Sequence, residues 1–295
     1  MNTHHMYDAH DLLQLWWTVP AGLALLGYAL SLAGLTPARR AVWTTARIVS
    51  VEQPAHGASK YPGIPVTVAF PHPAGGPDVV LPNTGKHGHT FTEAWVGREV
   101  AVRHPRGRPD RFRVVLDTVP DRSGRGTPNC AVALLLVGLV VHATVLWGYP
   151  WALLGFGALL TVFTATGADL RNVRLRAALL ADGVAVAVPA RVVAVTRDVH
   201  TDGEGEEIVN HAPVIVFTTA EGIRMTVLCR EGVPKPRSSL GRDLTIHYAP
   251  AAPRVYTPDL AAEHRDNEGT LGVVVLVLIA GVAATVTGAT LLWRQ

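Results

Sequence analysis

Residues 271–293 read LGVVVLVLIAGVAATVTGATLLW, a run of 23 residues that contains no Asp, Glu, Lys or Arg. A helix needs about 20 apolar residues to cross the roughly 30 Å hydrocarbon core of a bilayer. A helix of a soluble protein normally keeps a polar stripe toward water, and this run has none. The segment therefore predicts a membrane-spanning helix.

Three further runs of this kind span residues 12–35, 130–149 and 151–168. The chain as a whole is 48% hydrophobic and only 17% charged, whereas soluble proteins carry about 25% charged residues. This composition excludes a disordered or nucleic-acid-coating protein and disfavours a simple soluble enzyme. A cleaved signal peptide is also disfavoured, because residues 1–11 lack Lys and Arg and the first run is too long. Pro150 separates the second and third runs, which predicts a tight helical hairpin.

Arginine predicts the orientation of the chain. Lys and Arg in the flanks of a membrane helix mark the cytoplasmic side. The only basic residue on the opposite side is Arg294. The helix ends that face the two long polar segments are flanked by Arg39, Arg40, Arg47, Arg111, Arg113, Arg122, Arg125, Arg171, Arg174, Arg176, Arg254 and Arg265. We therefore expect both termini and the hairpin tip outside, and both polar segments in the cytoplasm.

The two polar segments resemble each other. Residues 46–51 (ARIVSV) match residues 190–195 (ARVVAV), and residues 97–102 (GREVAV) match residues 241–246 (GRDLTI), both 144 positions later. Between these anchors, residues 65–68 match residues 213–216 with a local shift of four. A common offset at separate anchors predicts an internal duplication.

Each segment predicts antiparallel strands, because apolar and polar residues alternate with a period of two. Examples are residues 66–70, 223–230 and 243–247. A single domain of this size has a thin core. Residues 36–128 carry a net positive charge and residues 170–269 a slight negative charge. We therefore expect the two domains to pair about a pseudo-twofold axis.

The predicted fold class is an α+β membrane protein, with four transmembrane helices that carry two small antiparallel β-barrel or sandwich domains. The expected parts are an N-terminal tail (1–11), helix 1 (12–35), a first β domain (36–128), helix 2 (129–149), helix 3 (150–168), an interfacial helix (169–183), a second β domain (184–269) and helix 4 (270–293). In the interfacial helix, Arg171, Arg174 and Arg176 are expected to reach lipid headgroups.

The ends of the two β segments resemble a bacterial membrane family known as domain of unknown function 3592. The similarity is carried by residues 97–105 (GREVAVRHP) with Pro109, by residues 241–248 with Pro250 and Pro253, and loosely by residues 61–70 (YPGIPVTVAF). His104 replaces the usual Tyr in the first segment, and the second has no Tyr before Pro213. The resemblance implies a membrane-tethered β domain and no activity, cofactor or catalytic residue. The strong preference for Arg over Lys is also typical of bacteria with GC-rich genomes.

Histidines are the weak candidates for a metal site. His72, His87 and His89, with His104 nearby in sequence, provide ligand types that zinc uses. No Cys-x-x-Cys or His-Glu-x-x-His motif accompanies them. Glycine and proline around them favour a polar loop, so we expect no metal and no other cofactor.

His142 is the one ionisable side chain inside a predicted span. Such groups are functional candidates. The alternative, which we favour, is a neutral His that bonds to a neighbouring helix, for which threonines offer partners. The candidate partners are Thr144, Thr161, Thr164 and Thr166.

Five arginines form a basic hook at the end of the first β segment. They are Arg103, Arg106, Arg108, Arg111 and Arg113. Close to a bilayer, such a cluster attracts anionic lipid headgroups at about 1 kcal/mol per residue. The alternative is the ordinary flanking charge of a membrane protein. Nucleic acid is not expected, because only Phe112 offers a ring for stacking within this run.

No nucleophile or nucleotide-binding loop is evident. Cys130 lies at a membrane end, Cys229 falls on a predicted core face, and neither has a cue for activation. Gly-x-Ser-x-Gly, Ser-x-x-Lys and the phosphate-binding Gly-x-x-x-x-Gly-Lys motif are absent.

The sequence therefore predicts a non-enzymatic scaffold or adaptor in the bacterial inner membrane. Its expected partners are the bilayer, other membrane or cytoplasmic proteins and anionic lipid. One alternative is a small transport or channel component whose subunits meet through Gly155, Gly157, Gly281 and Gly288. Another is a metal- or lipid-dependent membrane enzyme.

Overall fold

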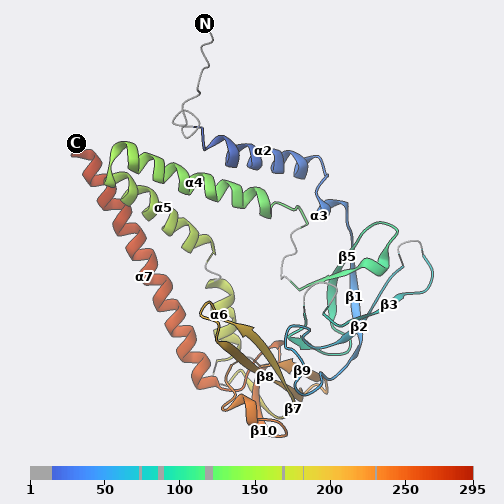
Figure 1. Cartoon of the computed structure of the whole chain (residues 1–295). Helices are drawn as coiled ribbons and strands as arrows, with labels where there is room; N and C mark the ends of the chain where they lie inside the picture. The colour runs from blue at the N-terminus through green and yellow to red at the C-terminus, as the bar shows by residue number, and fades with distance from the viewer. Residues whose placement is uncertain are drawn as a thin grey trace. The chain divides into compact units, whose positions relative to one another are not determined.

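The structure is a computed structural model and describes residues 15–72, 75–85, 90–116, 122–167, 170–181, 183–229 and 231–294. The chain divides into two compact units. A helical unit comprises residues 1–40, 121–170 and 269–295, and a β unit comprises residues 41–120 and 171–268. Figure 1 shows their helices and strands in chain order.

The helical unit contains α2 (Thr18–Leu32), α4 (Gly126–Trp147), α5 (Tyr149–Gly167) and most of α7 (Leu260–Trp293). Four helices of the described chain are long and apolar enough to cross a membrane, the first counted together with the short α3 (Pro37–Arg40). Only 6% to 11% of the residues in their apolar windows are buried. Helices that are apolar all round and exposed are typical of membrane spans.

A single residue, Gly148, joins α4 to α5. Its φ of 92° lies in the region that favours glycine. Pro150, which we expected between the two helices, lies in the first turn of α5. Proline is tolerated there because the backbone N–H that it lacks would have no acceptor within the helix. The tight hairpin is therefore present, and its turn is shorter than predicted.

Glycines bring α5 and α7 into close contact. A Cβ atom built on Gly157 would lie 2.7 Å from the backbone nitrogen of Thr285, and one on Gly281 would lie 3.2 Å from the carbonyl oxygen of Gly157. Gly288 meets the backbone of Pro150 and Leu154 in the same way. These glycines, which we had considered as faces between subunits, thus pack helices of one chain, because only residues without a side chain permit this approach.

The β unit contains two curled antiparallel sheets. Sheet A has the order β3-β2-β1-β5-β6, and sheet B has the order β11-β10-β7-β8-β9-β4. Sheet A consists of β1 (Val42–Val51), β2 (Val66–Phe70), β3 (Val79–Asn83), β5 (Glu99–His104) and β6 (Arg113–Val115). Sheet B consists of β7 (Val186–Thr201), β8 (Glu207–Thr218), β9 (Arg224–Leu228), β10 (Asp243–Ala249), β11 (Ala252–Thr257) and the short β4 (Glu93–Ala94). Apart from β4, the two sheets have the same strand order.

The strand registers of the two sheets also agree. Ala46 lies opposite Val100 in sheet A, and Ala190 lies opposite Leu244 in sheet B, so both pairs differ by 144 residues. One correction concerns the second strand of each sheet. Val66 lies opposite Val51, and Pro213 lies opposite Val195. Pro213 therefore corresponds to Val66 rather than to Pro65, and the local shift is three residues instead of four.

Each sheet buries its own apolar core. Val66, Val68 and Phe70 are at most 2% exposed in sheet A, as their alternation predicts. Met225, Val227 and Cys229 belong to the core of sheet B. An aromatic trio occupies equivalent places in the two cores, formed by Phe70, His104 and Phe112 in sheet A and by Phe217, Tyr248 and Tyr256 in sheet B.

The two β segments pair, but the pairing is not twofold. Strand β4 of the first segment joins sheet B through β9, where the N–H of Leu228 donates to the carbonyl of Thr92 at 2.7 Å. Within the described residues, sheet A receives no strand from the second segment. The register places Pro82 where sheet B has Leu228. Since proline has no N–H, the edge of sheet A lacks the donor that the edge of sheet B uses.

The loop that carries β4 is held by Arg98. The guanidinium of Arg98 donates to the backbone carbonyl and the carboxylate of Glu93, and it lies over the rings of Trp95 and Phe91. Burial lowers the pKa of Arg98, and the ion pair with Glu93 opposes this effect. Trp95 in turn packs against the core of sheet B.

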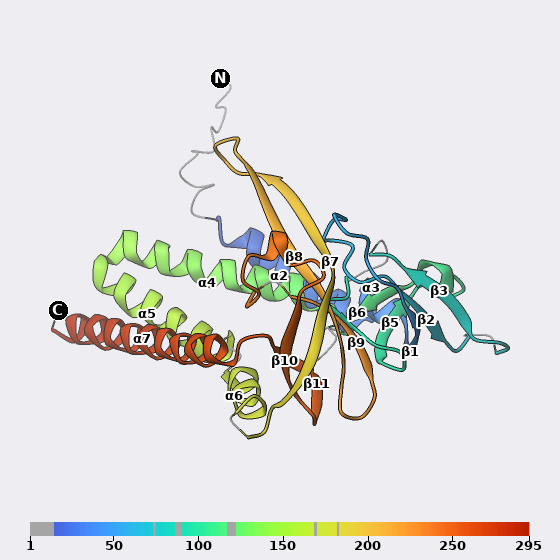
Figure 2. The same cartoon turned by 90° about the horizontal axis from the view of Figure 1, so that it is seen from below.

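The hairpin of β7 and β8 extends beyond sheet B as a two-stranded ribbon (Figure 2). We use the term ribbon for residues 197–211. Its outer pairs are Val199 with Val209 and His200 with Ile208. Val199, Ile208 and Val209 are 45%, 40% and 42% exposed, so neither sheet covers the outer half of the ribbon.

Candidate functional site

The β unit contains a polar cavity of about 430 Å³ beside the first turns of α7. Its walls come from Thr92 and Glu93, from α6 (Leu170–Leu179), from the chain after β9 and from β11. Its charged lining residues are Glu93, Arg176, Glu231, Arg254, Asp259, Glu263 and Asp266. Five carboxylates against two guanidinium groups give this lining a net negative charge, which favours a cationic group.

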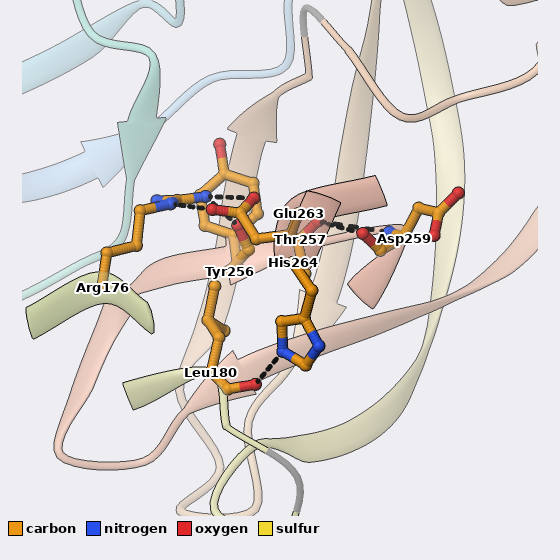
Figure 3. A network of polar contacts seen from close by, with 7 residues as sticks. All are labelled: Arg176, Leu180, Tyr256, Thr257, Asp259, Glu263 and His264. Carbon is orange, nitrogen blue, oxygen red and sulfur yellow. Dashed lines mark hydrogen bonds and ion pairs between the residues drawn. The ribbon is translucent and has the colours of Figure 1, made fainter. Parts of the chain in front are cut away.

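An ion pair between α6 and α7 forms one wall of the cavity (Figure 3). Arg176 donates to both carboxylate oxygens of Glu263, with a distance of 3.0 Å from Nη2 to Oε2. The same Nη2 donates to the backbone carbonyl of Tyr256 at 3.0 Å. Hydrogen bonding with Glu263 raises the pKa of Arg176. Arg176 was expected to reach lipid headgroups, and instead it binds a carboxylate 87 residues away.

The start of α7 is set by capping rather than by hydropathy. The Asp259 carboxylate accepts a hydrogen bond from the N–H of Ala262 at 2.9 Å, and Thr257 bonds to the backbone of Asp259. Such a cap satisfies a backbone donor that has no partner in a first helical turn. Consequently α7 begins at Leu260, eleven residues before the apolar run.

His264 makes a further link between α7 and the chain after α6. Its Nε2 lies 3.4 Å from the carbonyl oxygen of Leu180. Figure 3 marks this contact by a dashed line. A carbonyl only accepts, so this ring nitrogen carries the proton. Together with the ion pair, this contact fixes the beginning of α7 against α6 and β11.

Replacing Arg176 by Gln tests this junction. The variant leaves the Glu263 carboxylate and the Tyr256 carbonyl without their charged donor, so we expect the free energy of unfolding to fall by about 1–2 kcal/mol. Arg174→Gln is the matched control, because Arg174 lies on the same helix and is exposed. Denaturation of the full chain in detergent measures both. Equal stability of the two variants would contradict the role given to the ion pair.

The structure brings part of the basic hook together. Arg103 and Arg113 are cross-strand neighbours on β5 and β6, and the guanidinium of Arg103 lies 5.8 Å from the ring centre of Trp43. Arg106, Arg108 and Arg111 are exposed on the turn between these strands. Four arginines of the hook are thus exposed and Arg103 is half-buried, and the lipid contact of the hook stays a prediction.

The histidine candidates do not form a described metal site. His87 and His89 lie outside the described residues, and His72 is half-buried. His104 is 2% exposed and stacks on Phe70 in the core of sheet A, so it does not share a surface with a loop histidine. Among the residues that the structure describes, no group of three or more His, Cys, Asp or Glu is placed to hold a metal ion.

His142 contacts an aromatic ring on another segment. Its ring centre lies 6.2 Å from that of Trp16, which also packs on Gly138. Three of the four expected threonine partners, Thr144, Thr161 and Thr166, each donate to a carbonyl of their own helix. His142 thus has an aromatic neighbour, and its expected bond to a neighbouring helix stays a prediction.

The two cysteines are free thiols. Cys229 is buried at the wall of the polar cavity, as its place on the predicted core face implied. Burial raises the pKa of the Cys229 thiol to about 12. A thiol with this pKa stays protonated at neutral pH and is a poor nucleophile.

The residues that sequence reasoning missed are those whose partners lie far along the chain. Arg176 and Glu263, or Arg98 and the rings around it, show no motif that marks them. The one available signal was charge: α6 is basic, and Glu263 lies in the first turn of α7. No protein-family model, curated protein or solved structure matches this chain significantly, so the resemblance to domain of unknown function 3592 stays a prediction.

Proposed function

We propose that this chain is a non-enzymatic scaffold or adaptor of the bacterial inner membrane, and that its ribbon is the element that contacts a partner protein. The observation that carries the proposal is the ribbon itself, which extends beyond sheet B with apolar side chains exposed on both faces. Exposed apolar surface on a protruding element is typical of a protein-binding site.

The charge of the ribbon defines the expected partner. Its tip carries Asp202, Glu204, Glu206 and Glu207, all of them near or at the surface. Opposite charges steer association and select partners. The partner would therefore present an apolar centre surrounded by Lys or Arg.

The rigid base of the ribbon also supports an adaptor. The first β segment contributes β4 to sheet B, and residues 53–60 contact β7. The same strand order and registers in both sheets support the proposed internal duplication. We further propose, from the distribution of arginines, that the β unit faces the cytoplasm and both termini face outside. In that orientation the basic hook would contact anionic lipid.

Site-specific photocross-linking tests the adaptor proposal. A photoreactive phenylalanine analogue placed at Val199 or Ile208 of the full chain is expected to form a covalent adduct with a second protein in native membranes. Val80 is the matched control, because it is an exposed valine, 56% accessible, on the edge strand of sheet A. Adducts that form equally at Val80, or that fail to form on the ribbon, would contradict the proposal.

A further inference from the structure

A second cavity, of about 470 Å³, lies where the ribbon leaves sheet B. Its polar lining consists of His56 from the first β segment and of Arg197, His211 and Arg237 from the second. The remaining lining residues are two valines and a glycine, so this part of the described chain places no carboxylate on the cavity wall. The cavity is therefore cationic, in contrast to the acidic cavity beside α7.

The two guanidinium groups of this cavity are available to a ligand. Arg197 lies on β7 and Arg237 on the short helix η2 (Pro236–Ser238), and both are exposed. Neither side chain has a hydrogen-bond or ion-pair partner among the described residues. By contrast, Arg98, Arg176 and Arg242 of the same unit each donate to a carbonyl or carboxylate.

His56 presents a donor of defined position. The backbone N–H of Val195 donates to Nδ1 of His56 at 3.2 Å. Nδ1 therefore acts as an acceptor, and the neutral ring carries its proton on Nε2. The second nitrogen is thus an N–H donor that the backbone contact leaves unused.

The wall of the cavity is built by contacts between the two β segments. The N–H of Gly57 donates to the carbonyl of Val195, and the N–H of Arg197 donates to the carbonyl of Ala58, both at 2.8 Å. Next to them Asp198, which is 4% exposed, accepts a hydrogen bond from Ser59 at 2.9 Å and lies 3.6 Å from the ammonium of Lys60. These contacts hold residues 56–60 along β7 and place His56 in the same cavity as the two arginines.

We propose that this cavity binds the phosphate group of an anionic ligand. Planar guanidinium groups match phosphate oxygens in geometry and charge, and a histidine N–H adds a further donor. The volume lies within the range of small-molecule sites. The same chemistry serves a phosphorylated soluble molecule or the headgroup of an anionic phospholipid. The cavity shares Val209 with the outer part of the ribbon, but its charged and polar residues lie at the base. The proposal therefore does not depend on the scaffold role.

Binding of two probes to the full chain tests the proposal. Calorimetry with pyrophosphate, on protein in phosphatidylcholine nanodiscs, tests a soluble ligand. Thermal stabilisation in phosphatidylglycerol nanodiscs, relative to phosphatidylcholine, tests a lipid headgroup. We expect pyrophosphate binding, stabilisation by phosphatidylglycerol, or both. The double variant Arg197→Gln/Arg237→Gln is expected to lower the pyrophosphate affinity roughly tenfold or more, or to abolish the stabilisation by phosphatidylglycerol.

The matched control is Arg191→Gln/Arg224→Gln, which removes the same charge from exposed arginines of sheet B outside this cavity. It is expected to bind as the unchanged chain does. The proposal is overturned if neither probe has an effect, or if the cavity variant and the control behave alike. It is also overturned if pyrophosphate does not bind and the lipid effect survives in the cavity variant but disappears in Arg106→Gln/Arg108→Gln, because the hook would then be the lipid site.

Discussion

Leu228→Pro is expected to release β4 from the edge of sheet B, while the contacts of residues 53–60 with β7 remain. The substitution removes the N–H that donates to the carbonyl of Thr92 at 2.7 Å and leaves that carbonyl without its partner. An unsatisfied buried backbone group costs about 1–3 kcal/mol, and the 4%-exposed Leu228 side chain also loses packing. We expect a loss of about 2–4 kcal/mol in the free energy of unfolding.

Hydrogen exchange and denaturation of the full chain in detergent measure this effect. Exchange in residues 92–96 is expected to accelerate roughly tenfold or more, because β4 loses its place in the ladder. Leu228→Val keeps the backbone donor and removes one methylene group, so it isolates the side-chain contribution of about 1 kcal/mol.

Val80→Pro is the second control. It adds a proline to the edge strand of sheet A, two residues before Pro82. Because strands alternate with a period of two, the backbone nitrogens of residues 80 and 82 point in the same direction. We expect little change there, because an edge strand tolerates proline where its N–H faces away from the sheet. If Leu228→Pro proved as stable and as protected as Leu228→Val, the hydrogen bond from Leu228 would not hold β4 on sheet B.

Gly157→Leu is expected to force α5 and α7 apart. Its Cβ atom would lie 2.7 Å from the backbone nitrogen of Thr285 and 2.8 Å from the carbonyl oxygen of Gly281. Backbone atoms cannot rotate away as a side chain can, so the helices themselves must move. Overpacking of this kind costs about 1–3 kcal/mol or more. Thermal unfolding of the full chain in detergent is the direct measurement.

Gly167→Leu is the matched control on the same helix, because a Cβ atom there meets nothing within 4 Å. It is expected to leave stability unchanged or slightly raised, since leucine favours a helix more than glycine does. The experiment also separates two roles of the glycines. If Gly157→Leu changed the mass of the particle without lowering the stability of the chain, these glycines would mediate oligomers instead of packing α5 on α7.

Local sequence patterns predicted the long apolar helices and the strands with one buried face. The run at residues 271–293 lies within α7, and the alternation of Val66, Val68 and Phe70 matches their burial in sheet A. Such features depend on the period of a helix or a strand, which the order of residues displays directly. The ends of helices were harder to predict from the sequence. Helix α7 begins next to its Asp259 cap, within polar sequence, and not where the apolar run starts.

The candidate sites depend on partners that are remote in the chain. Arg176 looked like a flanking charge until the fold placed Glu263 beside it. Likewise His56 and Arg237 lie 181 residues apart and share one cavity only because residues 56–60 run along β7. Sequence spacing carries no information about such contacts, since strand pairing between distant segments decides them.

The amino-acid sequence by itself determined that this chain has four apolar helices and two segments of β-strands, because hydrophobic length and periodicity are local properties. Only the tertiary structure decided how the segments join. The N–H of Leu228 finds the carbonyl of Thr92, whereas Pro82 offers no donor at the corresponding place. The two sheet edges thus differ in one backbone N–H donor. The sequence does not show the effect of this difference, because the acceptor comes from a strand that is distant in the chain.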